Sequence, residues 1–369
     1  MYIHERNDWP DFHWDYGKLI GLLSEVRYLQ GRLLGRMQEL GFELRESATL
    51  QTLTLDVTKT SEIEGEKLND EQVRSSLAKR LGIQLNQHPR VDRHVEGIVE
   101  VMLDAVRNYE NPLSTDRLFS WHAALFPTGT SGLHTIAVGH WRNGPMQVVS
   151  GSYGREKVHY EAPAAEHLQK EMTTFINWFN TPSDLDMVLK SAIAHFWFVT
   201  IHPFDDGNGR IARALADMLL ARAEQSKQRF YSMSSQIQKE RNAYYDILEK
   251  CQKGSLDITE WLDWFLNCMK RAIIASEEIL QAVLTKANFW KIHSDEAFNE
   301  RQRMIINLLF ENFEGKLTSS KWAKLTKCSQ DTALRDINDL VQRKILLKDN
   351  AGGRSTGYRL RVQMQNYFL

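Results

Sequence analysis

Nine consecutive residues near the middle of the chain combine several chemically reactive residue types. They read His202-Pro203-Phe204-Asp205-Asp206-Gly207-Asn208-Gly209-Arg210, and Arg213 follows one helical turn later. An imidazole can accept a proton near neutral pH, a carboxylate is a hard oxygen ligand for Mg²⁺, and guanidinium groups bind phosphate. Together these residue types predict a site that binds a polyphosphate and uses a hydroxyl group as the attacking group.

The pattern around this stretch predicts how it folds. Residues 184–199 are apolar on almost every side, which is typical of a buried helix, and this helix should end before Pro203. Gly207 and Gly209 permit a tight turn, after which residues 210–223 form a second helix. A helix N-terminus attracts anions, whereas two arginines in its first turns oppose the helix dipole. A bound polyanion therefore explains the arginines better than helix stability does.

The same stretch matches in full the signature H-x-F-x-[DE]-G-N-G-R-x-x-R, by which the chain resembles the Fic domain family. Most proteins of that family transfer AMP from ATP to a Ser, Thr or Tyr hydroxyl of a protein. The resemblance implies that His202 is the general base, that Phe204 anchors the loop in the core, and that Asp206 holds Mg²⁺ against the α- and β-phosphates. The phosphate contacts that it further implies are Gly207, Asn208, Gly209, Arg210 and Arg213.

A hairpin is predicted upstream of this site. The strand-like run Met146-Gln147-Val148-Val149 is bounded by turn residues, and a lone hairpin is stable only if it lies over something else. It resembles the family's flap, which pairs with the target segment as an added strand and helps to enclose the nucleotide. The flap contacts implied for the nucleotide are Val149, Ser150, Gly151 and Ser152.

A looser resemblance concerns the adenine pocket. It assigns Tyr244, Tyr245 and Gln252 to the segment that lines this pocket. An aromatic pair on a helix is equally typical of a core, and that alternative stays open.

A second motif lies upstream. Thr60-Ser61-Glu62-Ile63-Glu64-Gly65 resembles the family's inhibitory motif [ST]-x-x-x-E-[GN], and it places Thr60 and Glu64 on one helix face. The resemblance implies that Glu64 pairs with Arg213 and so occupies the arginine that a γ-phosphate needs. In some members of the family the same glutamate helps a water molecule to remove AMP. The sequence leaves both roles open.

The chain as a whole is predicted to be mainly α-helical, because the 3.6-residue apolar period recurs along most of it, for example over residues 19–40, 91–109 and 164–179. His195 lies within the buried helix and is interpreted as a hydrogen-bonded core residue. Four parts are predicted: a helical N-terminal domain with the inhibitory motif, the Fic core with its flap, a linker, and a winged-helix domain. Their ranges are 1–90, 91–287, 288–300 and 301–369.

The last part is predicted from helix and strand signals. Thr318 or Ser319, and Ser329, are good helix N-caps, and two short strands follow around Asp349–Gly353. From Arg301 onward the sequence holds 13 Lys/Arg and 6 Asp/Glu, a balance of +7. This charge suits DNA, but the acidic residues Asp331, Asp336 and Asp339 on the expected recognition helix disfavour it. Docking on the core or on a protein partner is the alternative.

Overall composition mainly excludes classes of protein. Three well-separated cysteines give no disulfide framework and no zinc spacing, and no run of about 18 apolar residues predicts a membrane span. The N-terminus has no secretory pattern, so a cytoplasmic location is expected.

The predicted function is Mg²⁺-dependent transfer of AMP from ATP to a target protein and to the chain itself, with a homodimer left open. Two alternatives remain. One is transfer of another phosphate-containing group, and the other is a nucleotide-sensing transcription regulator.

Overall fold

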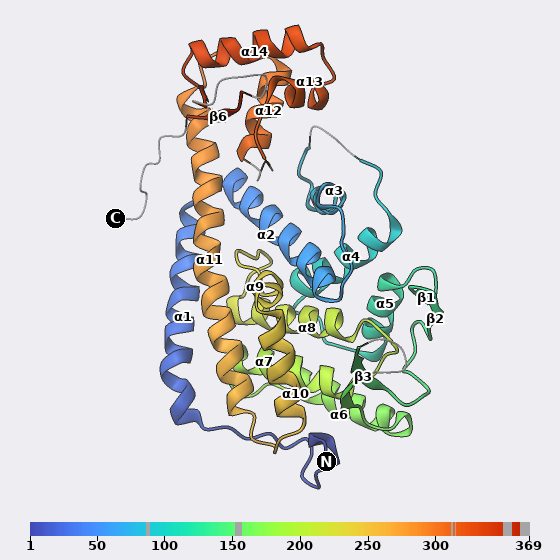
Figure 1. The fold of residues 1–369 in the computed structure, drawn as a ribbon. Coiled ribbons are helices and arrows are strands. Elements are labelled where there is room, and N and C mark those ends of the chain that lie inside the picture. The colour runs from blue at the N-terminus through green and yellow to red at the C-terminus, as the bar shows by residue number, and fades with distance from the viewer. Residues whose placement is uncertain (86–88, 152–156, 311–312, 314, 350–355, 362–369) are drawn as a thin grey trace. The chain divides into compact units, whose positions relative to one another are not determined.

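Helices make up most of the protein, as the sequence predicted (Figure 1). The computed structural model describes residues 1–85, 89–151, 157–310, 313, 315–349 and 356–361. Two compact units divide the chain, Met1–Glu277 and Glu278–Leu369. None of the helices in these described ranges is long and apolar enough to cross a membrane.

The first unit contains the residues of the predicted site. Its helices are α1 (Tyr16–Glu39), α2 (Phe42–Ile63), α3 (Asp70–Leu81), α4 (Arg93–Arg107), α5 (Thr115–Leu125), α6 (Leu168–Asn180), α7 (Met187–Ile201), α8 (Asn208–Glu224), α9 (Met233–Lys239), α10 (Arg241–Gln252) and most of α11 (Thr259–Ile292). Two short 3₁₀ helices are Ile3–Glu5 and Ala165–His167. The strands are β1 (Thr130–Ser131), β2 (His134–Thr135), β3 (Gln147–Ser150) and β4 (Lys157–Glu161).

Helices α7 and α8 pack against each other in the core of this unit. Every residue of α7 from Val188 to Ile201 is buried, which confirms the expectation for a helix that is apolar on all sides. His195 is a core residue as predicted, since its Nε2 lies 2.8 Å from the Tyr244 hydroxyl and burial lowers its pKa to about 3. The tight α7–α8 pair provides a rigid base for the loop that joins the two helices.

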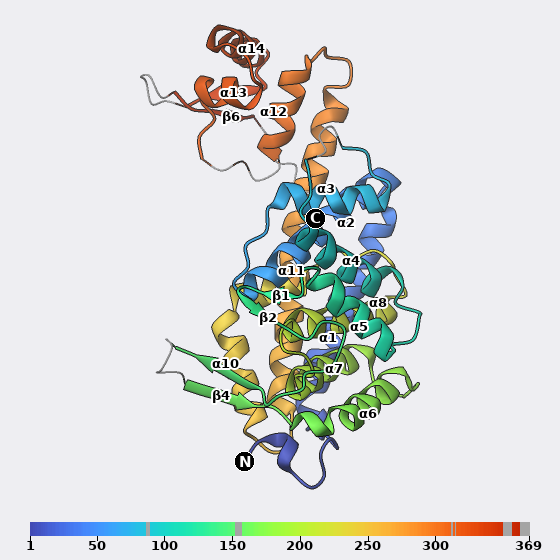
Figure 2. The ribbon, with the colours of Figure 1, turned by 90° about the vertical axis from the view of Figure 1, so that its right-hand side faces the viewer.

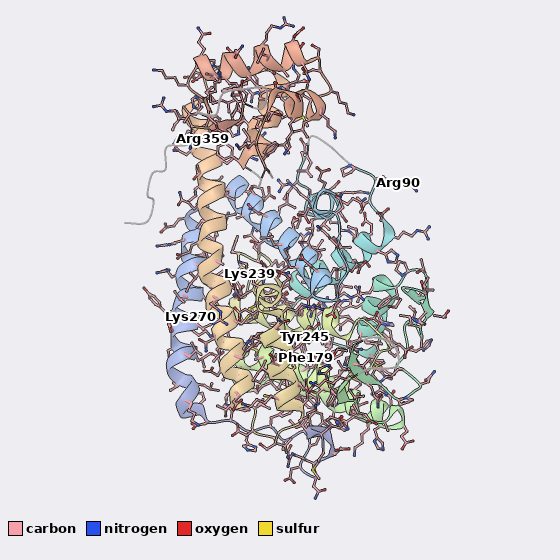
Figure 3. All side chains as sticks on the ribbon, in the orientation of Figure 1. Arg90, Phe179, Lys239, Tyr245, Lys270 and Arg359 are labelled. Carbon is pink, nitrogen blue, oxygen red and sulfur yellow. The ribbon has the colours of Figure 1, made fainter. Side chains whose placement is uncertain are left out.

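Helix α1 runs along α11 (Figure 1). Lys270 of α11 places its Nζ 2.6 Å from Glu25 of α1, and Figure 3 shows this lysine on the side of α11 that faces α1. Further along, Arg36 of α1 lies 3.3 Å from Glu277. These ion pairs join α1 to α11 in the first unit.

Helix α2 packs on α9 and also meets α8. Its buried residues Leu50, Leu53, Val57 and Thr60 recur three or four positions apart, which is the spacing of one helix face. The helix ends at Ile63, with Glu64 as its C-cap residue. Gly65 then adopts φ +86°, which turns the chain away.

Strands β3 and β4 form an antiparallel hairpin with a bulge at Val148–Val149, and strand signals in the sequence had predicted this hairpin. Figure 2 shows it projecting beside α10. Its base is closed by a hydrogen bond from the Ala162 N–H to the Met146 carbonyl, 2.9 Å long. Ser152 lies outside the described residues.

The second unit holds α12 (Glu300–Phe310), α13 (Ser319–Leu325), α14 (Gln330–Gln342), β5 (Leu346–Lys348) and β6 (Tyr358–Leu360). Thr318 and Ser329 are N-caps as expected, because their side chains accept hydrogen bonds from the Lys321 and Thr332 N–H groups. Strands β5 and β6 pair in antiparallel fashion. The winged-helix and DNA-binding assignments for this unit stay predictions.

Two local details of this unit differ from the sequence expectations. Residues 288–292, expected to begin a linker, are the last turn of α11, since Phe289 packs into a buried cluster with Ile305 and Trp322. Asp336 is buried and pairs with Arg301, and Asp339 pairs with Arg343. Among the three acids that disfavour DNA, only Asp331 has no such ion pair within the described residues.

Candidate active site

His202 lies at the turn that ends α7. It adopts φ 51° and ψ 58° as the helix C-cap, and its N–H donates to the Phe198 carbonyl at 3.0 Å. Its ring Nδ1 is 3.1 Å from the Val199 carbonyl oxygen. A carbonyl can only accept a hydrogen bond, so Nδ1 carries the proton and Nε2 keeps its lone pair. Burial lowers the pKa of His202, although the Val199 hydrogen bond opposes this, and the ring is therefore neutral at physiological pH.

The loop after His202 is held from inside by Asn208. The Asn208 side chain accepts from the Phe204 N–H (3.0 Å) and donates to the Phe204 carbonyl (2.8 Å). Phe204 is fully buried, as expected of an anchor, and its ring stacks on His122 at 4.2 Å. The sequence placed Asn208 in the phosphate cradle, but in this structure its side-chain amide is used to shape the loop.

Asp206 faces the β1–β2 turn. Its carboxylate accepts hydrogen bonds from the Ser131 hydroxyl and from the Gly207 N–H. His122 supports the loop that carries Asp206, because its Nε2 lies 3.2 Å from the Asp206 carbonyl oxygen. This arrangement orients one carboxylate beside the start of α8.

The Asp206 carboxylate fits Mg²⁺. The ion is usually held by one or two protein carboxylates together with substrate phosphates. No group of three or more His, Cys, Asp or Glu that could hold a metal occurs within the described ranges. A single oriented carboxylate therefore suits a magnesium ion that arrives with a nucleotide.

Helix α8 begins at Asn208, with Gly207 as its N-cap at φ +82°. A side chain at Gly207 would collide with the Phe126 ring, 2.9 Å from the position of a Cβ. Arg210 is 8% exposed and lies over Phe126, with its guanidinium carbon 4.9 Å from the ring centre. The glycine thus lets the helix start close against α5, where the arginine is also held.

Arg210 and Arg213, in the first turns of α8, are engaged by residues at and just after the C-terminal end of α2. Arg213 donates from Nη2 to Glu64 Oε1 (2.7 Å) and to the Thr60 carbonyl (3.0 Å), and from Nε to the Thr60 hydroxyl (2.6 Å). Burial would lower the pKa of Arg213, but the Glu64 carboxylate raises it overall. Arg210 lies 3.2 Å from Glu66. Ser61 is fully buried, and no hydrogen bond joins its hydroxyl to the described residues.

The described part of the hairpin is tied to α10. The Ser150 hydroxyl lies 2.5 Å from His159 Nε2, and His159 Nδ1 lies against Glu249 of α10. Val149 is 47% exposed, and Gly151 is exposed at φ +109°. An exposed strand of this kind can accept a further strand.

The three residues assigned to an adenine pocket are not grouped on one open surface. Tyr244 is 1% exposed with its hydroxyl against His195, and Gln252 is buried with its amide 3.3 Å from the Thr200 hydroxyl. Tyr245 is 37% exposed and lies on α10 close to the end of α2, with its hydroxyl 3.4 Å from the Ile63 carbonyl (Figure 3). Only Tyr245 has a face that is open to a ligand in this structure.

Sequence reasoning did not single out four residues that shape this site. They are Glu66, His122, Ser131 and Arg142. Glu66 was the most accessible to prediction, since it lies two residues after Glu64. The other three are far from the motif in sequence, and only the tertiary fold brings them to it.

Two family models match the chain. A family model described as the Fic/DOC family matches residues 112–220, which include the loop and both arginines. A second, described as a domain of unknown function (DUF4172), matches residues 2–83, which include the motif at residues 60–65.

Curated relatives carry the same domain. A protein adenylyltransferase Fic from Nematostella vectensis is 32% identical over 148 residues, which are 39% of this chain and 32% of the relative. One from Culex quinquefasciatus is 28% identical over 216 residues, 57% of this chain and 39% of the relative. The chain thus spans about a third to two fifths of the length of these relatives.

Solved structures show the same fold. A Fic family protein from Desulfovibrio desulfuricans G20 has a TM-score of 0.53 and 20% identity, and the match covers 94% of this chain and 97% of that one. A Fic domain containing signaling protein from Bacteroides thetaiotaomicron VPI-5482 has the same score and identity and covers 70% of this chain. At this identity the likeness concerns the fold.

Proposed function

The chain belongs to the Fic/DOC family through residues 112–220, and from this premise we propose that it is a protein adenylyltransferase. It transfers AMP from ATP to a Ser, Thr or Tyr hydroxyl of a target protein or of the chain itself. The observation that carries the proposal is the lone pair on His202 Nε2 at the turn that leads into Arg210 and Arg213.

The transfer needs one base and several cations. The target hydroxyl oxygen bonds to the α-phosphorus, the bond to pyrophosphate breaks, and the hydroxyl proton passes to His202 Nε2. Arg210 and Arg213 bind the outer phosphates at the α8 N-terminus. Asp206 would hold Mg²⁺, whose charge would offset that of the phosphates. The exposed edge of β3 receives the target segment as an added strand.

The end of α2 acts as a brake in this proposal. Arg213 is 2% exposed and already bonded to Glu64 and Thr60, and Arg210 is bonded to Glu66. A nucleotide that needs these guanidiniums must displace two carboxylates. AMP removal by a water that Glu64 activates is a further proposed activity of the same residue, and loss of AMP from modified protein on incubation without ATP would reveal it.

The test is intact-mass analysis after incubation with ATP and Mg²⁺. We expect Glu64→Gly to raise self-AMPylation at least about tenfold, because a charge-assisted hydrogen bond contributes about 1.5–3 kcal/mol. Glu62→Gln is the matched control, since Glu62 lies on the same turn but bonds Lys59 and Gln238. Unchanged labelling in Glu64→Gly would remove the brake from the proposal.

The same assay separates the alternatives. His202→Ala in the Glu64→Gly background should abolish AMP transfer. A nucleotide-sensing regulator needs no base, so its function would be insensitive to this change. Competition between labelled ATP and other nucleotides or phosphocholine donors would identify a different transferred group.

A further inference from the structure

Arg142, in the loop between β2 and β3, is a buried charge that the proposed chemistry does not use. Its side chain is 1% exposed. Nε donates to the His202 carbonyl (2.8 Å), Nη1 to the Gly144 carbonyl (2.7 Å), and Nη2 to the Pro163 carbonyl (2.5 Å). The Arg142 N–H also donates to the Pro203 carbonyl at 2.9 Å. Three separate chain segments therefore meet at one side chain.

Burial of the Arg142 guanidinium costs folding free energy. The hydrogen bonds described for this guanidinium all end on backbone carbonyls, and burial lowers the pKa of Arg142, opposed mainly by the Asp205 charge. Burying a cation without an ion-pair partner costs free energy, and an apolar side chain could fill the same space without that cost. A rigid fork of donors is what lysine cannot supply. Geometry is thus the property that arginine adds here.

The joined segments carry the two parts of the protein that the proposed reaction uses, the base and the hairpin that receives the target. His202 is held in a positive-φ turn, a conformation that L-residues adopt only when their surroundings enforce it. Gly144 and Pro163 flank the β3–β4 hairpin at its base, just outside the Met146–Ala162 hydrogen bond. The turn cannot shift against the hairpin base without breaking a hydrogen bond of Arg142.

We propose that Arg142 is a positioning residue that fixes the position of the His202 turn relative to the base of the β3–β4 hairpin. The inference rests on the proposed role of His202 as the base.

The charge of Arg142 has a second effect, on the imidazole. The charged groups that act on His202 are Arg142, Glu64 and Asp206. Burial lowers the pKa of His202 most, Arg142 lowers it further, and the two carboxylates raise it. Removal of the Arg142 charge is therefore expected to raise the pKa, so that charge and geometry can be tested separately.

Two variants separate these effects in the Glu64→Gly background. Arg142→Lys keeps the charge but loses the fork, so we expect kcat for self-AMPylation to fall about 10- to 100-fold, with KM for ATP changed less than about threefold. Arg142→Met loses both, and the His202 pKa, followed by NMR of ring-labelled histidine, should also rise. Arg222→Lys is the control, since Arg222 also donates to backbone carbonyls, those of Tyr109 and Asn111.

Three outcomes would overturn the inference: kcat within twofold of the parent in folded Arg142→Lys, an unchanged His202 pKa in folded Arg142→Met, or an equal loss of kcat in Arg222→Lys. If Arg142→Met does not fold, the kcat and KM values of Arg142→Lys decide. A parent protein without any AMP transfer would refute the proposed function, whereas the NMR titration would still test the Arg142–His202 coupling.

Discussion

At the scale of single residues, the site depends on a position without a side chain, Gly209, as well as on the side chains that surround it. A Cβ at Gly209 would lie 2.2 Å from Glu64 Oε1 and 3.2 Å from Arg213 Nη1. The lack of a side chain at Gly209 therefore leaves the space that the Glu64 carboxylate occupies. The sequence suggested glycine here for turn formation and phosphate binding, and it could not indicate that Glu64 needs the same space.

The effect of Gly209→Ala on the unfolding free energy should consequently have opposite signs in the parent chain and in Glu64→Gly. In the parent chain we expect a loss of about 1–3 kcal/mol in unfolding free energy, because the new methyl group displaces Glu64. In Glu64→Gly the clash with the carboxylate is gone and only the 3.2 Å contact with the end of the Arg213 side chain remains, so alanine should stabilise the helix by up to about 1 kcal/mol over glycine. Urea unfolding of the four proteins measures the coupling, expected to exceed about 1 kcal/mol.

Gly31→Ala provides the matched control for this cycle. Gly31 lies in α1, and a Cβ there would meet nothing within 4 Å. Its effect should be the same in both backgrounds. Strictly additive effects of Gly209→Ala and Glu64→Gly would show that the carboxylate does not occupy this position in solution.

At the scale of elements, the sequence predicted helix ends better than it predicted contacts. The end of α7 before Pro203, the turn at Gly207 and the caps at Thr318 and Ser329 follow from local residue preferences, and the structure has all of them. The contact of α2 with α8 follows from tertiary packing, which no local pattern records. Only the resemblance at 60–65 indicated it.

A buried acid also lies between these two helices. Asp217 of α8 is 1% exposed, its Oδ1 accepts from Arg229 Nη2 at 3.0 Å, and its Oδ2 has no partner among the described residues. Burial, reinforced by the charge of Asp56 of α2, raises the Asp217 pKa to about 8. The folded protein therefore binds this proton more tightly than the unfolded chain does.

The sign of the pH effect follows. The stabilisation is complete below the ordinary pKa of 3.8 and is lost as pH rises towards about 8. The slope can reach about 1.4 kcal/mol per pH unit for one proton. Asp217→Asn mimics the protonated acid and should flatten the profile between pH 5 and 8, as measured by urea midpoints. Asp8→Asn, at an exposed position, is the control, and parallel profiles for Asp217→Asn and parent would contradict the assignment.

At the scale of the whole molecule, each unit has a core of its own. The buried cluster of the second unit consists of Phe289, Ile305, Ile306, Leu317, Trp322, Ala323, Ala333, Ile337, Leu340, Ile345 and Leu346. All of these follow residue 288, whereas every residue of the proposed active site precedes residue 253. The sequence predicted a linker over residues 288–300, whereas α11 runs without a break to Ile292, across the boundary between the two units at Glu277.

This separation predicts that a chain of residues 1–287 folds and keeps the site. The cut lies after Leu280 and Val283, which are 3% and 6% exposed, and before Phe289, the first residue of the second cluster. We expect a cooperative thermal transition by circular dichroism, and in the Glu64→Gly background the same AMP transfer per molecule as the full chain.

Loss of the cooperative transition would show that the first unit needs the second to fold. A normal transition with altered transfer would instead show that the second unit acts on the reaction, as a regulator or as a contact for the target. The shorter chain retains the His202 loop, the hairpin and the turn at Glu64.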